Sequence, residues 1–264
     1  MRVSRLVLAI IAAIAIIAVI GIVWFFVSSG SGEASQPITA PTLAVTVPAT
    51  TTAETPVPTA ETTADATEAP VAEATAAAAA SAGDPVVFSL VQGESSISFE
   101  LDEDMRGQRV TVIGTSPDVA GQVAVNFADP SASQIGQIAF NLRTLDTGND
   151  FRNRALRGQI LQSAQDAFEF GSFTPTAVTG LPTTPIESGE TVTFQITGDL
   201  TLRDVNNPVT FDVTLTEASE ERLVGQATAT VNRNDWGLTI PDVPGIANVE
   251  EEVVLTIVIV AAPD

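Results

Sequence analysis

The sequence predicts an all-β domain, either a sandwich or a closed barrel, with one helix inserted between its strands. Apolar and polar residues alternate with a period of two in successive segments between residues 84 and 264, as half-buried antiparallel strands do. Turn-forming sequences such as Ser116-Pro117-Asp118 separate these segments. Only after Thr147 does the period lengthen towards 3.6. Regularly spaced short strands of this kind build sandwiches and barrels.

Each predicted strand carries apolar side chains on one face, and we expect these faces to form the core. In chain order the apolar positions are Ile97, Phe99 and Leu101; Val119, Val123, Val125 and Phe127; Ile138, Phe140 and Leu142; Val192, Phe194, Ile196, Leu200 and Leu202; Val209, Phe211, Val213 and Leu215; and Leu223, Ala227, Ala229 and Val231. The last segment, EEVVLTIVIVAA, is more densely apolar and closes the chain.

One stretch, TLDTGNDFRNRALRGQILQ, interrupts the strands and is predicted to be the helix. Thr147 and Asp150 are the expected N-caps, and Leu156 and Ile160 share one face at i,i+4. Three of the eleven basic residues of the chain, all of them arginines, fall on its polar side: Arg152, Arg154 and Arg157. Two roles are open for them. They pair with nearby carboxylates, at ~0–1 kcal/mol for each surface pair, or they bind the anionic end of a ligand.

The N-terminus, residues 1–27, is predicted to be an uncleaved membrane anchor. Arg2 and Arg5 precede Leu6–Val27, an uncharged apolar run that is long enough as a helix to cross a hydrocarbon core of about 30 Å. The alternative, a cleaved signal peptide, has a shorter apolar region of ~7–15 residues. We therefore expect a single-pass protein of the cell membrane, with its N-terminus in the cytoplasm and its C-terminal domain extracytoplasmic.

Residues 28–83 are predicted to be a disordered linker between the anchor and the domain. Thr, Ala, Pro and Ser dominate this range, which lacks the large apolar side chains needed to offset the conformational entropy lost on folding. TVPATTTAETPVPTAETT is typical of stalks that can be O-glycosylated. Residues 84–264 then form a single folded domain.

Charge and residue types exclude several classes of function. The net charge of −21 repels nucleic acid, so no nucleic-acid partner is expected. The chain has no His, Cys, Lys or Tyr, which removes Ser-His-Asp, Cys-His and Schiff-base catalysis and any His/Cys zinc site. We expect a protein that is not an enzyme and that needs no metal or cofactor.

Three ordered motifs resemble the YceI-like family. They are LRTLDTGNDFRNRALRGQILQ with FEFGSFTP after it, GDLTLRDVNNPVTFDVTL, and ATATVNRNDWGL, and the resemblance runs from about Phe88 to Ala261. It implies an eight-stranded, lipocalin-like antiparallel barrel with a helical insertion, whose apolar channel holds polyisoprenoids or other long amphiphiles. Many members carry a histidine where this chain reads DEDMRGQRVTVIGTSPDVAGQ, so no head-group role of that histidine carries over.

The resemblance makes the inward face of the barrel the candidate ligand site. Its predicted lining residues are Phe99, Val123, Val125, Phe127, Ile138, Phe140, Leu142, Phe168, Phe170, Phe194, Ile196, Phe211, Val213 and Trp236, and the candidate head-group contacts are Arg152, Arg154 and Arg157. Small inward residues such as Gly198, Gly225 and Ala227 leave space for a ligand. An eight-stranded barrel can equally be filled by its own side chains.

Two functions remain open. The first is a membrane-tethered extracytoplasmic binding protein that holds a polyisoprenoid or similar long lipid, with a prenyl quinone as one candidate, for carriage, storage or sensing. Its partners would be that lipid and the membrane entered by Leu6–Val27. The second is a non-catalytic surface interaction or structural module with a filled barrel core. A lipid that copurifies with the domain would separate the two, and the sequence indicates no oligomeric state.

Overall fold

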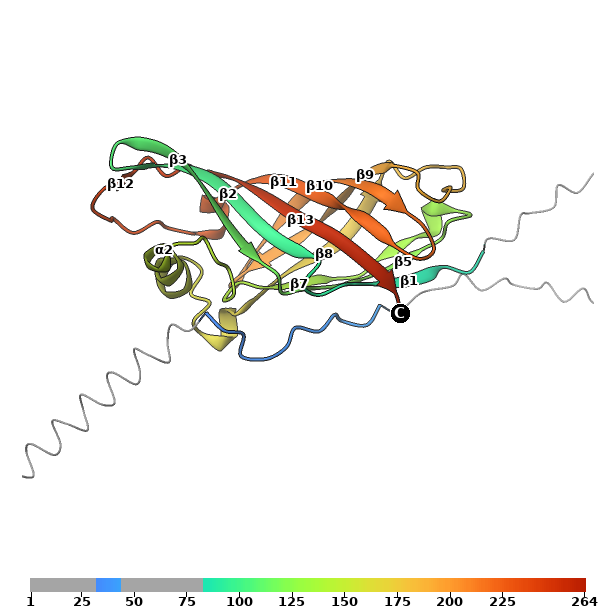
Figure 1. Cartoon of the computed structure of the whole chain (residues 1–264), viewed down its shortest axis with the longest axis horizontal. Helices are drawn as coiled ribbons and strands as arrows, with labels where there is room; N and C mark the ends of the chain where they lie inside the picture. Colours follow the sequence, from blue (N-terminus) through green and yellow to red (C-terminus); the bar gives the residue numbers. More distant parts are fainter. Residues whose placement is uncertain (1–31, 44–82) are drawn as a thin grey trace, which may run out of the picture.

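The structure, a computed structural model, describes residues 32–43 and 83–264 (Figure 1). A curled antiparallel sheet of thirteen strands makes up most of it, which confirms the all-β prediction. The strands are β1 (Val86–Leu90), β2 (Ser96–Met105), β3 (Gln108–Ser116), β4 (Val119–Ala120), β5 (Gln122–Val125), β6 (Gln134–Ile135), β7 (Ile138–Asn141), β8 (Phe170–Thr179), β9 (Val192–Leu202), β10 (Val205–Ala218), β11 (Leu223–Asn232), β12 (Ile246–Ala247) and β13 (Glu252–Pro263).

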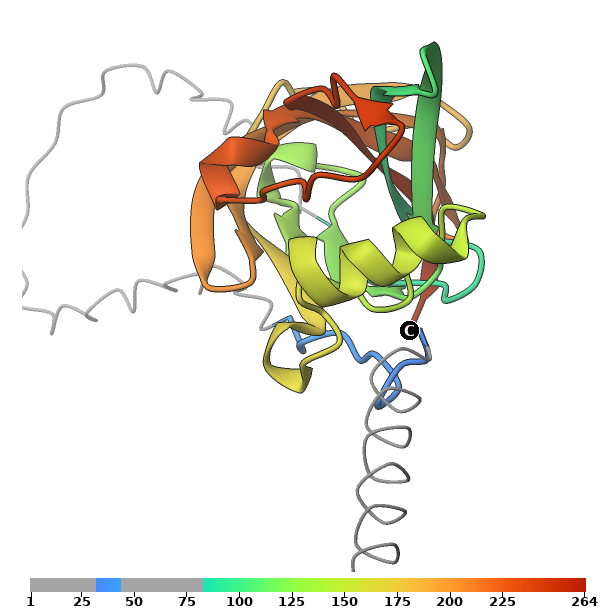
Figure 2. The same cartoon turned by 90° about the vertical axis from the view of Figure 1, so that its left-hand side faces the viewer.

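The sheet is strongly curled (Figure 2). Its strand order is β4-β7-β8-β9-β10-β11-β13-β1-β5-β6. Strand β2 lies outside this order and pairs with β13, β3 and β12. Because Gly121 alone separates β4 from β5, strands near opposite ends of the path are neighbours in the chain. Figure 2 shows the strands surrounding the interior. The sheet has thirteen strands where the resemblance to the YceI-like family implies eight, because bends such as the one at Gly121 divide the longer runs.

The predicted helix is present as α2 (Asp150–Ala155), which continues into a π-helical turn, η2 (Leu156–Ile160). Its N-cap is Asn149, whose side chain accepts hydrogen bonds from the backbone N–H groups of Phe151 and Arg152. The expected caps Thr147 and Asp150 are therefore wrong. The 3-10 turns η1 (Pro130–Ala132), η3 (Asp166–Phe168) and η4 (Arg233–Trp236) complete the helical segments of the described chain.

Aromatic rings on inward positions lie over glycines of the neighbouring strand. Phe99 on β2 pairs with Gly114 on β3, and Phe140 on β7 pairs with Gly171 on β8. A Cβ atom at either glycine would collide with the ring opposite. The glycines thus let the rings lie close against the sheet, which keeps them out of the centre of the interior.

Residues 32–43 fall within the expected linker, yet they lie along the outside of the sheet (Figure 1). Ile38 is buried there, and the backbone N–H of Leu43 donates to Gln122 Oε1 at 2.8 Å. The rest of the linker and the expected anchor Leu6–Val27 lie outside the described residues. No helix within the described ranges is long and apolar enough to span a bilayer.

Candidate functional site

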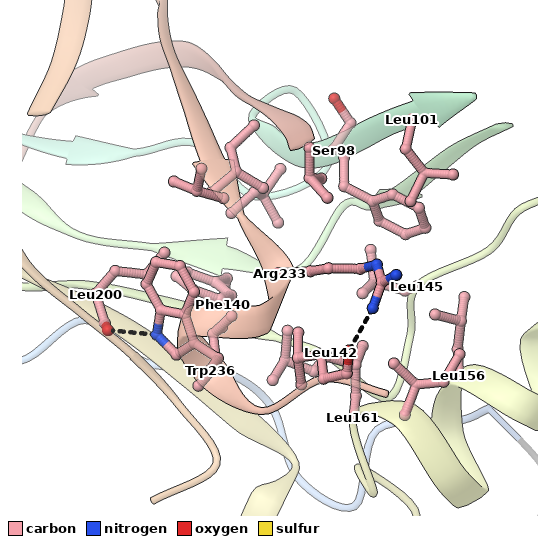
Figure 3. Close-up of a pocket in the computed structure, with 18 of the residues that line it drawn as sticks. Ser98, Leu101, Phe140, Leu142, Leu145, Leu156, Leu161, Leu200, Arg233 and Trp236 are labelled. Atoms are coloured by element: carbon pink, nitrogen blue, oxygen red, sulfur yellow. Dashed lines mark hydrogen bonds between the residues drawn. The ribbon is translucent and has the colours of Figure 1, made fainter. Parts of the chain in front are cut away.

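A cavity of about 110 Å³ lies inside the sheet, next to α2 and η2 (Figure 3). Its walls are almost entirely apolar, and the indole of Trp236 is fixed in one wall because its Nε1 donates to the Leu200 carbonyl at 3.0 Å. The lining residues are Ile97, Ser98, Phe99, Leu101, Phe140, Leu142, Leu145, Leu156, Ile160, Leu161, Leu200, Leu202, Val231, Arg233, Trp236, Leu238, Ile240, Val253 and Leu255.

A second apolar cavity, of about 100 Å³, lies further along the interior. Strand β9 lines it with Val192, Phe194 and Ile196, whereas Leu200 and Leu202 of the same strand line the first cavity. The two cavities therefore occupy opposite ends of the sheet interior. The remaining lining residues are Phe88, Leu90, Gly121, Gln122, Val123, Val125, Ser133, Ile135, Ile138, Val178, Leu181, Ile186, Val213, Leu215, Leu223, Ile257 and Ile259.

A third cavity, of about 170 Å³, extends from the first towards the surface at the α2 end. It shares Phe99, Leu101, Leu156, Ile160 and Ile240 with the first cavity. Unlike the interior cavities, it is lined by several polar side chains and by loop residues. Its other lining residues are Glu103, Met105, Val112, Asn149, Phe151, Arg152, Ala155, Pro241, Val243, Ile246 and Val249. This cavity is the mouth of the interior.

The rings of Phe173 and Phe211 lie between the two interior cavities. Both are buried, and they meet edge to face with centroids 5.0 Å apart and planes at 76°. Phe173 pairs across strands with Leu200, which lines the first cavity, and Phe211 pairs with Ile196, which lines the second. Neither ring lines a cavity. The pair therefore fills the part of the interior that separates the first cavity from the second.

The three helix arginines have different surroundings. Arg152 lines the mouth cavity and forms an ion pair of 2.6 Å with Glu103, a buried carboxylate on β2. Arg154 is exposed, and its guanidinium lies 5.9 Å from the ring centre of Phe151. Arg157 lies beside the described N-terminal segment, against Gly32. Of the three, Arg152 is thus the one at the mouth cavity, and Glu103 already neutralises its charge.

Asn153 holds α2 in place at the mouth. Its Nδ2 donates to Asp146 at 2.7 Å, and its Oδ1 accepts from the backbone N–H of Thr147 at 2.9 Å. Hydrogen bonds from the Gly148 backbone and from Asn153 lower the pKa of Asp146 despite some desolvation, and the charge of Arg157 adds to this effect. Since Asp146 also bridges to β3, the helix is connected to the sheet through this carboxylate residue.

The model of the YceI-like domain matches residues 88–261, which include nearly all of the strands. The chain belongs to the YceI-like family. Among curated proteins, a UPF0312 protein of Pseudomonas putida strain W619 is 32% identical over 133 residues, covering 48% of this chain and 64% of the relative. A UPF0312 protein of strain GB-1 gives the same identity and coverage. The chain thus spans 64% of the length of these relatives.

Two solved structures are similar to this YceI-like chain. One is a polyisoprenoid-binding domain from Saccharophagus degradans implicated in plant cell wall breakdown, with a TM-score of 0.53 and 16% identity, covering 68% of this chain and 99% of that domain. The other is BcnA of Burkholderia cenocepacia, with a TM-score of 0.49 and 17% identity, covering 66% and 99%. At these identities the first likeness is one of fold alone.

Most of the predicted lining residues of the YceI-like domain border a cavity. Phe99, Phe140, Leu142 and Trp236 line the first, and Val123, Val125, Ile138, Phe194, Ile196 and Val213 line the second. Phe127, Phe168, Phe170 and Phe211 line none of the three cavities. Phe127 packs on the Phe88 ring at 6.2 Å. Gly171 and Phe173 are the buried positions of β8, so Phe170 lies on the opposite face of that strand.

Sequence reasoning missed the side chains that close the first cavity from loops and turns. Leu145, Leu161 and Leu238 follow no strand period, so no pattern marks them as inward. Arg233 was also missed. It lines the first cavity, where its guanidinium donates to the carbonyls of Leu238 at 2.8 Å and Glu250 at 3.0 Å. These bonds hold the loops beside the cavity together.

Proposed function

We propose that this chain is a binding protein that holds a polyisoprenoid or another long amphiphilic lipid inside its sheet. The observation that carries the proposal is the pair of interior cavities with almost wholly apolar walls. Polar side chains in them are confined to Ser98 and Arg233 in the first and to Gln122 and Ser133 in the second. A hydrocarbon chain needs no polar partner, since burial alone contributes about 25 cal/mol per Å² of apolar surface.

The size of the cavities favours an elongated ligand. Each is smaller than the roughly 300–1,000 Å³ typical of ligand pockets, so a long lipid must occupy more than one of them. The mouth and the first cavity share walls and form one path. To continue into the second cavity, the lipid has to displace the rings of Phe173 and Phe211. A flexible chain lying along the interior meets these conditions better than a compact polycyclic molecule.

The proposed container is a closed barrel of eight runs, in which β1 with β2, β3 with β4 and β5, β6 with β7, and β12 with β13 each count as one. A lipid head group would remain at the mouth, on the end of the domain that carries Arg152, Arg154 and Arg157, where charge-assisted hydrogen bonds can hold a phosphate. The proposed anchor Leu6–Val27 would keep the barrel outside the cytoplasm and close to the membrane that supplies the lipid. Carriage, storage and sensing are all compatible with this arrangement. The name of the Saccharophagus degradans domain supports the ligand class.

Native mass spectrometry and lipid extraction of the full-length protein, purified from membranes, test the proposal. We expect close to one prenyl or acyl lipid per chain. Leu255→Trp, which fills the first cavity, should reduce the bound lipid, whereas Val254→Trp on the outer face of the same strand should not. A chain that is empty and also refuses added prenyl quinones would instead support the filled-core interaction module.

A further inference from the structure

Residues 32–43, called here the N-terminal strap, bind the outside of the domain. At the start of the strap, Gly32 lies so close to the guanidinium of Arg157 that an added Cβ would be 2.7 Å from Nη1. Further along, Ile38 is buried, and its carbonyl accepts a hydrogen bond from Gln92 Nε2 at 2.7 Å. Figure 1 shows the strap starting at the α2 end and running along the sheet towards the C-terminus. The strap precedes the matched family domain, which begins at residue 88.

The firmest attachment of the strap is to a buried carboxylate. Glu169 is fully buried and accepts hydrogen bonds from the backbone N–H of Ser35, at 2.8 Å, and from the Ser35 hydroxyl. Asn141 Nδ2 donates to it at 2.9 Å, and Arg143 Nη1 lies 3.2 Å away. A buried carboxylate deprived of such partners is strongly unfavourable, so Glu169 fixes Ser35 on the domain.

The α2 end of the domain exposes large apolar side chains around the mouth. Phe151 is 83% exposed and Val243 is 45% exposed, although both line the mouth cavity. Arg154 lies over the Phe151 ring, so a cation flanks the apolar group. Figure 2 shows α2 and the segment before β12 together at this end. Aromatic and aliphatic side chains beside arginine are typical of surfaces that enter the headgroup region of a bilayer.

The short distance along the chain between the proposed anchor and the strap indicates that the α2 end of the domain faces the membrane. Gly32 is five positions after Val27, the end of the proposed anchor. Five residues span at most about 18 Å even when fully extended. Because Gly32 lies beside Arg157, the start of the strap keeps the α2 end within this reach of the point where the anchor leaves the membrane. The opposite end has no such constraint.

We propose that the strap holds the α2 end of the domain on the surface of a phospholipid bilayer, with Phe151 and Val243 entering the interface. This inference rests on the anchor and the lipid-binding function proposed above. The mouth then faces the membrane, and a lipid passes between bilayer and cavity without exposing its chain to water. Glu169 and Ser35 act as positioning residues, since they set the orientation without touching the lipid.

Depth-dependent quenching tests the orientation in the full-length protein. The chain has no cysteine, so Asp242→Cys beside Val243 and Ser188→Cys in the loop between β8 and β9 each give one labelling site for a fluorophore. Each labelled protein is reconstituted into phosphatidylcholine vesicles that contain a lipid with a nitroxide on its acyl chain. We expect several-fold stronger quenching at position 242 than at position 188. Adding Phe151→Ser and Val243→Ser should reduce the difference.

The strap has its own test in the same vesicles. Ser35→Pro removes both hydrogen bonds to Glu169 and should bring quenching at position 242 close to that at position 188. Thr39→Pro places a proline at an exposed position of the same strap, away from Glu169, and should leave the difference intact.

Equal quenching at the two positions in the parent protein would overturn the proposal, and so would a chain that fails to float with the vesicles. Lipid extracted from the same samples separates this outcome from the proposed function. Bound lipid with equal quenching rejects the orientation but retains lipid binding. Unequal quenching without bound lipid retains the orientation and rejects lipid binding.

Discussion

Phe173 and Phe211 meet edge to face at the one level of the interior where the first cavity ends and the second begins. Each ring comes from a different strand, and Phe173 fits because Gly198 lies beneath it: a Cβ there would be 2.6 Å from the ring. An edge-to-face pair contributes about 0.5–1.5 kcal/mol beyond its buried area. The pair is thus both a part of the core and a barrier within the proposed lipid path.

Truncating this barrier should join the cavities at a cost in stability. Phe211→Ala removes a fully buried ring, and we expect the free energy of unfolding to fall by about 3–5 kcal/mol. The enlarged interior should accept longer prenyl chains than the parent protein does. Urea titration measures the first effect, and mass spectrometry of bound prenyl alcohols of graded length measures the second. Thr230→Ala on the outer face of β11 is the control. An unchanged preference for chain length would contradict a barrier role.

The glycine beneath Phe140 gives a second prediction. Gly171→Ala places a methyl group where the ring lies, so the ring must move into the first cavity. We expect a loss of about 1–3 kcal/mol in the free energy of unfolding, together with weaker lipid binding. The matched control is Gly158→Ala in the π-helical turn, where no atom lies within 4 Å of the added Cβ. There the same change should stabilise the protein by about 0.5–1 kcal/mol. Similar losses at both positions would contradict the packing argument.

The sequence predicts those parts of the site that a strand period marks. Phe99, Phe140 and Phe194 alternate with polar residues, and all three line a cavity. The same argument fails at Phe168 and Phe170. They precede β8 or begin it, where the 3-10 turn η3 interrupts the period, so the alternation cannot tell which side of the strand faces inward.

Long-range features could not be predicted from the sequence. Nothing in the composition of residues 32–43 indicates that Ser35 meets Glu169, because the contact joins positions that are 134 residues apart. The division of the interior between two cavities depends likewise on the register of β8 and β10 against β9. A period of two defines the face of each strand but not the level at which two rings meet.

The helix arginines should differ in their effects on a charged head group. Arg154 forms no ion pair within the described chain, so its charge is open to a phosphate. We expect Arg154→Ala to weaken binding of a prenyl phosphate by roughly tenfold, the value of a charged hydrogen bond, and to leave binding of the prenyl alcohol unchanged. Its stability should change by less than about 0.5 kcal/mol. Titration calorimetry with both lipids checks this, and equal losses for both would contradict a head-group contact.

Arg152 should behave differently because it neutralises Glu103. In the parent protein, Arg152 Nη2 lies 2.6 Å from Glu103 Oε1. Arg152→Ala leaves this buried carboxylate without its ion-pair partner. We expect the free energy of unfolding to fall by about 1–3 kcal/mol. The double variant Arg152→Ala with Glu103→Ala should recover part of this loss, since it removes the unpaired charge as well. Urea titration of the three proteins makes the comparison, and no recovery in the double variant would show that the ion pair is not the cause.

The attachment of the strap should depend on pH through Glu169. Burial raises the pKa of this carboxyl group, but hydrogen bonds from Ser35 and Asn141 and the charge of Arg143 outweigh burial and lower the pKa below its ordinary value of 4.5. A group whose pKa is lower in the folded state stabilises the protein above its unfolded pKa, and this contribution is lost as the pH falls through the folded value.

At pH 7, Glu169→Gln should therefore be less stable than the parent by about 1–3 kcal/mol. Urea titrations at decreasing pH should show this difference in the free energy of unfolding shrinking once the pH falls below the ordinary pKa of 4.5. Glu187→Gln, at an exposed loop position, should show no comparable gap at any pH. A gap for Glu169→Gln that stays constant into acid would mean that packing, rather than the charge that holds Ser35, accounts for the difference.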